Sequence, residues 1–106
     1  MKYVAKKKVQ PIDKAHDPQT FTKMSVCRKN QLVEFILRHF HDQKKPNLAF
    51  TSYTLTEMCN FPVTNGEFKG AMLLCGFTTP NPNNTYCHFN VAESSKAIKE
   101  WRRGLR

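Results

Sequence analysis

The stretch TLTEMCNFPVTNGEFKGAMLLCGF, residues 54–77, limits the fold most strongly because it contains two helix starts in close succession. Thr54 and Glu57 have the spacing of a capping box, in which each side chain accepts a hydrogen bond from the other residue's backbone. Thr64 and Glu67 repeat that spacing. The stretch therefore predicts two helices that follow each other directly.

Breakers define where these two helices end. Pro62 stops the first, because proline lacks a backbone N–H and disfavours helical geometry in the residue before it. Gly76 suits the left-handed residue that follows a helix. We expect a short helix, a tight turn and a longer helix, which has one apolar face at helical spacing formed by Phe68, Ala71, Met72 and Cys75.

A further helix is predicted upstream, from Ser25 to about Gln43, with Ser25 as its N-cap and Pro46 beyond its end. Its period is 3.6 residues. The side expected to face the core holds Leu32, Val33, Ile36, Leu37 and Phe40, and the outer side holds Arg28, Gln31, Glu34 and Arg38.

The region after Gly76 predicts a hairpin and then a closing helix. FTT and TYCHFNV are rich in β-forming residues and flank the turn-forming PNPNN. Residues 93–106 read as a helix with Ala97, Ile98, Trp101 and Leu105 on one side. The expected fold class is α+β, with a three-helix core, a C-terminal β-hairpin and a closing C-terminal helix. Residues 1–20 are expected to form a basic arm or edge strand, and residues 21–106 one domain.

This order of elements resembles the winged helix-turn-helix class over roughly residues 25–91. The resemblance rests on TLTEMCNFPVTNGEFKGAMLLCGF and on the candidate wing FTTPNPNNTYCHFNV. The run FKGAMLLCGFTTPNPNNTYCHF is also similar to winged-helix modules of phage and plasmid replication proteins. In that class the third helix enters the DNA major groove and the wing touches the backbone. The resemblance implies contacts from Thr64, Asn65, Gly66, Lys69, Gly70 and Leu73, with Asn83 and Asn84 at the wing tip.

Charge gives an independent indication of a polyanionic partner. The chain has 17 Lys and Arg against 8 Asp and Glu, a net +9, and double-stranded DNA is the expected partner. Residues 46–95 are net −2, so most contacts are expected to be with phosphates and to come from the two ends of the chain. The candidates there are Lys6, Lys7, Lys8, Lys96, Lys99, Arg102, Arg103 and Arg106.

Two other uses of such a scaffold stay open. The glycine-lined side of the third helix would also accept a protein helix, so a protein-binding adaptor or inhibitor, for example of a nucleic-acid enzyme, is the alternative. A purely structural interpretation is open as well, in which Gly66 and Gly70 only relieve crowding against the N-terminal segment. An RNA-binding module ranks third, because no aromatic stacking motif is recognisable in the sequence. The oligomeric state does not follow from these patterns.

Catalysis, metal and membrane insertion are not indicated. The sequence has no P-loop, no G-x-S-x-G, no H-E-x-x-H and no close pair of acids, so no enzymatic activity and no cofactor are expected. The four cysteines form no C-x-x-C pair, and a zinc site from Cys87 and His88 with His39 or His41 is disfavoured. Without an apolar span or a secretory signal, a cytoplasmic location is expected.

Overall fold

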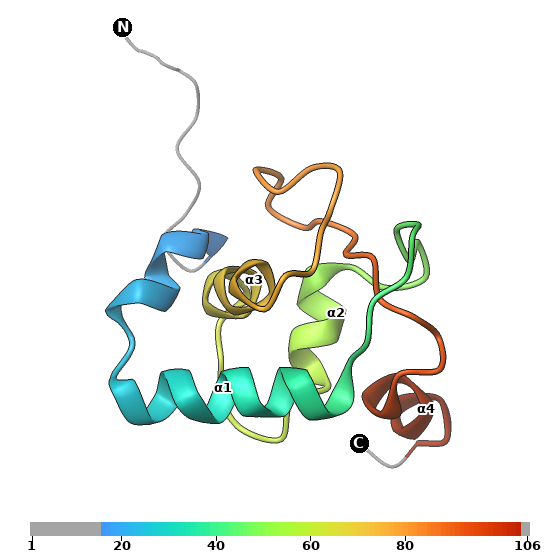
Figure 1. Cartoon of the computed structure of the whole chain (residues 1–106), viewed down its shortest axis with the longest axis horizontal. Helices are drawn as coiled ribbons and strands as arrows, with labels where there is room; N and C mark the ends of the chain where they lie inside the picture. The colour runs from blue at the N-terminus through green and yellow to red at the C-terminus, as the bar shows by residue number, and fades with distance from the viewer. Residues whose placement is uncertain (1–15, 105–106) are drawn as a thin grey trace, which may run out of the picture.

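Five helices make up about half of residues 16–104, the part of the chain that the computed structural model describes (Figure 1). In chain order they are the 3₁₀ helix η3 (Pro18–Lys23) and the α-helices α1 (Val26–His39), α2 (Ser52–Glu57), α3 (Asn65–Leu74) and α4 (Lys96–Arg102). These described residues contain no strand, and their β-type pairing is limited to an isolated bridge between Asp42 and Val91.

Helix α1 begins as predicted and ends earlier. The Ser25 hydroxyl accepts from the backbone N–H of Arg28 at 3.2 Å, which confirms the N-cap. The helix ends at His39 because the next residue, Phe40, takes up an extended conformation, and the predicted end at Gln43 is wrong. Its buried side chains, counting Phe40 at the cap, are Leu32, Phe35, Ile36 and Phe40. Leu37, expected in the core, is 62% exposed.

Of the two predicted capping boxes, one is confirmed. In α3 the Glu67 backbone N–H donates to the Thr64 hydroxyl at 3.1 Å, and the Thr64 N–H donates to the Glu67 carboxylate at 3.0 Å. In α2 the cap is Thr51, whose hydroxyl accepts from the N–H of Thr54 at 3.3 Å. The box at Thr54 and Glu57 is therefore wrong, because the helix has already begun where that box would cap it.

The predicted end of α3 is confirmed. Gly76 has φ of 93°, in the left-handed region that favours glycine. Its N–H donates to the Leu73 carbonyl at 3.1 Å, and the Phe77 N–H donates to the Met72 carbonyl at 3.0 Å. This pair of bonds is the Schellman arrangement, and it satisfies carbonyls that would otherwise be left without partners at the helix end.

The predicted hairpin is absent, so the α+β winged-helix prediction is wrong. Residues 77–91 form a loop, and Pro80 and Pro82 within it have no N–H for a ladder. Its carbonyls instead accept from the segment before α2 and from the first residue of α2. The bonds are Gln43 N–H to Asn90 O (3.1 Å), Asn47 N–H to Phe89 O (3.0 Å) and Ser52 N–H to Cys87 O (2.7 Å). Burial of Cys87, Phe89 and Val91 holds the loop to the core without a sheet.

The closing helix is present as α4. Its Ala97 and Ile98 are fully buried, and Trp101 packs partly against the core, as the apolar period predicts. Gly104, with φ of 73°, follows the helix. The predicted inward Leu105 lies outside the described residues.

Helix η3 lies against α3 (Figure 1). Asp17 is its N-cap, accepting from the Gln19 N–H at 2.9 Å, and Pro18 supplies a backbone angle already suited to a helix start. Phe21 of η3 is buried in the core. Residues 16–20, assigned from the sequence to the arm, are therefore in contact with α3.

Candidate nucleic-acid interface

Lys69, the one cation expected on the DNA-reading side of α3, is fully buried, with 0% of its surface exposed. Its ammonium group donates to the carbonyls of Asn84 at 2.7 Å, His16 at 3.1 Å and Thr85 at 3.3 Å. Burial lowers the pKa of Lys69, while Cys87 and Asp17 act in the opposite direction. The side chain joins α3 to the segment before η3 and to the 77–91 loop.

Asn65, the residue expected to recognise adenine, is also internal. Its side-chain amide donates to the Thr85 carbonyl at 2.7 Å and to Nδ1 of His16 at 3.0 Å. Its carbonyl oxygen is buried without a hydrogen-bond partner. Asn65 and Lys69 thus hold the same two segments, one turn of α3 apart.

The glycines of α3 face the protein's own chain, so the expectation of an open glycine-lined side is wrong. A Cβ on Gly66 would meet the backbone carbonyl of Asp17 and would lie 2.7 Å from its nitrogen. A Cβ on Gly70 would meet the carbonyl of Pro18 and would lie 2.6 Å from Cβ of Phe21. Glycine at both positions is required by the close approach of η3, and the surface expected to receive DNA or a protein helix is occupied.

The remaining expected positions on this side are at the surface. Thr64, Leu73, Asn83 and Asn84 are exposed, although the Asn84 carbonyl accepts from Lys69. The DNA contacts implied by the resemblance therefore do not form one surface. Asn65, Gly66 and Lys69 are buried, whereas the four residues above are accessible.

The basic residues of α4 do form a coherent site, together with the end of α1. A cleft of about 320 Å³ lies there; we name it the cationic cleft, and its lining is Arg38, His41, Ser94, Lys96, Lys99, Glu100 and Arg103. Four of these residues are cationic and one is a carboxylate, which leaves a net +3. His41 Nε2 lies 2.6 Å from the Ser94 hydroxyl, which adds two polar groups suited to phosphate oxygens.

Arg38 is the one cationic residue lining the cleft that was not predicted from the sequence as a binding residue. Periodicity placed it on the outer side of α1, which is correct, but gave no reason to group it with α4. Its ion pair with Glu34, at 3.6 Å, is largely exposed and therefore weak. Arg38 is available to an anionic partner.

Arg102 differs from its neighbours on α4. Its guanidinium donates to both carboxylate oxygens of Glu93, at 2.9 and 3.0 Å, and lies 4.9 Å from the centre of the Phe50 ring. The hydrogen bond from Arg102 lowers the pKa of Glu93 and correspondingly raises that of Arg102. Arg102 is thus engaged within the protein, and Lys6, Lys7, Lys8 and Arg106 lie outside the described residues.

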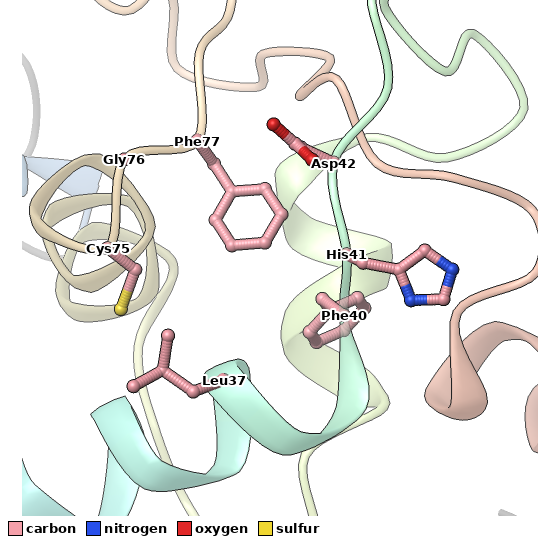
Figure 2. A pocket seen from close by; sticks show the side chains of 7 residues that line it. All are labelled: Leu37, Phe40, His41, Asp42, Cys75, Gly76 and Phe77. Carbon is pink, nitrogen blue, oxygen red and sulfur yellow. The ribbon is translucent and has the colours of Figure 1, made fainter.

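A second pocket, of about 230 Å³, contains the combination of a cysteine and a histidine (Figure 2). Cys75 lies on one side of it beside Leu37, and the His41 ring is directed away from the thiol. Burial raises the pKa of Cys75, which disfavours the reactive thiolate form. This pocket offers no nucleophile paired with a base.

Each histidine considered as a zinc ligand has a different partner within the protein. His39 stacks on Phe35 with ring centres 4.1 Å apart, and Nδ1 of His88 lies 3.0 Å from the Phe50 carbonyl. Burial raises the pKa of Cys87, with Lys69 acting against that shift. Among residues 16–104, no cluster of three or more His, Cys, Asp or Glu side chains has the proximity needed to hold a metal ion.

No helix in the described part of the chain combines the length and apolar character needed to cross a membrane. Comparison of the sequence with protein-family models and with curated proteins, and of the fold with solved structures, gave no match.

Proposed function

We propose that this chain binds double-stranded DNA through phosphate contacts at the cationic cleft, as a regulator or accessory factor. The observation that carries the proposal is the convergence of Arg38, Lys96, Lys99 and Arg103 on one cleft whose lining has a single carboxylate. When cations grouped in this way neutralise DNA phosphates, counterions condensed on the DNA are released. This release favours binding independently of the base sequence. A cytoplasmic location remains part of the proposal.

The experiment is a salt titration of binding to a random duplex, measured by fluorescence anisotropy. If the four cations of the cleft each contact a phosphate, log Kd should change with log salt concentration by about 3 to 4 in slope. Replacing Arg103 with Ala should lower the slope by about 0.9 and weaken binding equally for all duplex sequences.

Two matched variants test whether the cleft, rather than total charge, is responsible. Lys23→Ala removes an exposed cation of η3, and Arg102→Ala removes a cation of α4 that is already paired with Glu93. Both should leave the slope nearly unchanged. If the wild type shows no duplex binding at low salt, or if Arg103→Ala and Lys23→Ala have the same effect, the proposal is wrong.

A protein-binding role is the second candidate, and a different surface favours it. A groove of about 390 Å³ between η3 and the end of α3 is mainly apolar, and its lining includes the exposed Leu73 and Leu74 together with Phe21. Under this alternative, Leu74→Asp should abolish binding of the partner, whereas Arg103→Ala should not affect it. The absence of duplex binding at low salt would favour this role over the first.

A further inference from the structure

Three aromatic rings from distant parts of the sequence meet at one place on the surface. Tyr53 of α2 and Tyr86 of the 77–91 loop have ring centres 6.0 Å apart at an interplanar angle of 72°. Tyr86 and His16 have ring centres 5.4 Å apart at 78°. We name these residues the aromatic cluster. The aromatic cluster cannot be recognised from the sequence, because 37 and 33 positions separate its members along the chain.

The rings of the aromatic cluster remain accessible. Tyr53 is 48% exposed and Tyr86 is 50% exposed, whereas the phenylalanines of the core are nearly all buried. In an edge-to-face pair, one ring presents an edge and the other a face. Tyr53 makes one such contact, so at least one of its faces has no aromatic partner within the cluster.

The cluster is held by contacts that do not depend on the rings themselves. Asn65 and Lys69 donate to the Thr85 carbonyl, directly before Tyr86. On the other side of Tyr86, the backbone of Cys87 is bonded to Ser52, at 2.7 Å through its carbonyl and at 3.3 Å through its N–H. The rings are thus presented by backbone that is already ordered, which reduces the entropy cost of binding.

The sequence that leads into the aromatic cluster is basic. Figure 1 shows the 77–91 loop rising above α2 and α3, with α1 on the opposite side. His16 is the residue at which the described part of the chain begins, and the 15 residues before it include five lysines and one acid. Asp17 is already engaged as the η3 N-cap. Proteins that bind single-stranded nucleic acids combine exposed aromatic rings, on which bases stack, with basic residues, which attract the phosphates.

We propose that the aromatic cluster binds unpaired bases of single-stranded nucleic acid, with Tyr53 and Tyr86 as the stacking surfaces. This inference rests on the proposed function for the class of partner, and it adds a base-contacting site to the phosphate-contacting cleft. Such stacking tolerates any base sequence, because every base has a π-face.

The experiment compares a fluorescein-labelled 12-nucleotide oligo(dT) with a duplex of 12 base pairs by anisotropy, using the full chain. Tyr53→Ala and Tyr86→Ala should each raise the Kd for oligo(dT) roughly 5- to 150-fold, the loss expected for one stacked base. The same variants should change the Kd for the duplex less than about twofold, because paired bases are already stacked on each other. An oligo(U) of the same length tests RNA, and equal losses with both probes are expected because stacking does not involve the sugar.

Conservative variants separate stacking from folding. Tyr86→Phe retains the ring and should retain binding, whereas Tyr86→Leu retains apolar bulk and should lose it. Leu48→Ala, at a residue that is 75% exposed in another loop, should have no effect. The proposal is overturned if the Leu variant binds oligo(dT) like the wild type, or if the tyrosine variants weaken both DNA probes equally.

The two proposals fail in different ways. If the wild type binds oligo(dT) in a tyrosine-dependent manner but does not bind the duplex, the cationic cleft is not a duplex site and the aromatic cluster stands. If it binds the duplex with the salt slope expected from four phosphates but the tyrosine variants do not change the Kd for oligo(dT), only the proposed role of the aromatic cluster is refuted.

Discussion

At the residue scale, Lys69 shows how one side chain can change the interpretation of a helix. Considered by spacing alone, it is an outward lysine beside two glycines and so a natural DNA contact. In the structure its three donors are directed at three backbone carbonyls of two other segments. A buried ammonium is tolerated only when it is hydrogen-bonded in this way. Its role in the structure is that of an internal clamp.

Replacing Lys69 with Met should lower the free energy of unfolding by about 1–3 kcal/mol, because three part-buried carbonyls lose their donor. Urea denaturation followed by circular dichroism measures the change. Lys44→Met, at an exposed lysine, is the matched control and should change stability by less than about 0.5 kcal/mol. An unchanged Lys69→Met variant would show that the three hydrogen bonds contribute nothing to stability.

The difference in stability between the wild type and Lys69→Met should depend on pH. Because burial lowers the pKa of Lys69, the folded state releases this proton at a lower pH than the unfolded state does. Between the lowered pKa and the ordinary value of 10.5, the unfolded state therefore binds more protons, and the contribution of Lys69 to stability rises with pH. The difference between wild type and Lys69→Met should grow as pH increases through that window.

At the element scale, the contact between η3 and α3 decides which surface of the molecule is free. Glycine at positions 66 and 70 costs α3 about 1 kcal/mol each relative to alanine, but it allows the η3 backbone to approach closely. In sequence the same glycine spacing reads equally well as a surface left free for a guest. The spacing correctly indicates a close backbone approach, and it leaves the identity of the neighbour open.

Gly70→Ala should therefore destabilise the protein, although alanine favours a helix. The added Cβ would overlap the Pro18 carbonyl and Cβ of Phe21, a strain of about 1–3 kcal/mol that exceeds the helix gain. Thermal unfolding measures the balance. Leu73→Ala, on the same side of α3 but exposed, should have a smaller effect. A Gly70→Ala variant more stable than wild type would mean that η3 does not press on α3.

At the scale of the whole molecule, the cysteines differ in how deeply they are buried. Cys27 is exposed at the start of α1, whereas Cys87 is 1% exposed and has a pKa raised by burial. Only the thiolate reacts with alkylating reagents, so burial protects Cys87 in two ways.

Iodoacetamide labelling of the native protein should modify Cys27 promptly and leave Cys87 unmodified until the core opens. Peptide mass spectrometry after timed labelling, with and without denaturing urea, measures both sites. Urea below the unfolding transition is the control and should not speed the labelling of Cys87 to the rate of Cys27. Equal rates in the absence of urea would contradict the packing of the 77–91 loop.

The sequence by itself determined the features that depend on a few neighbouring residues. The cap at Ser25, the capping box at Thr64 and Glu67, and the left-handed Gly76 were predicted and are present. Their hydrogen bonds join residues that are at most five positions apart in the sequence. The apolar period likewise identified much of the core.

Three features were decided only by the tertiary structure. They are the packing of η3 on α3, the loop conformation of residues 77–91, and the grouping of charged and aromatic side chains on shared surfaces. Those outcomes depend on hydrogen bonds such as the one from Lys69 to His16, 53 positions apart. A pattern in sequence records that a face is suited to close contact. Which segment makes that contact depends on the competition among all segments for the same buried hydrogen bonds, and that competition is resolved only when the chain packs.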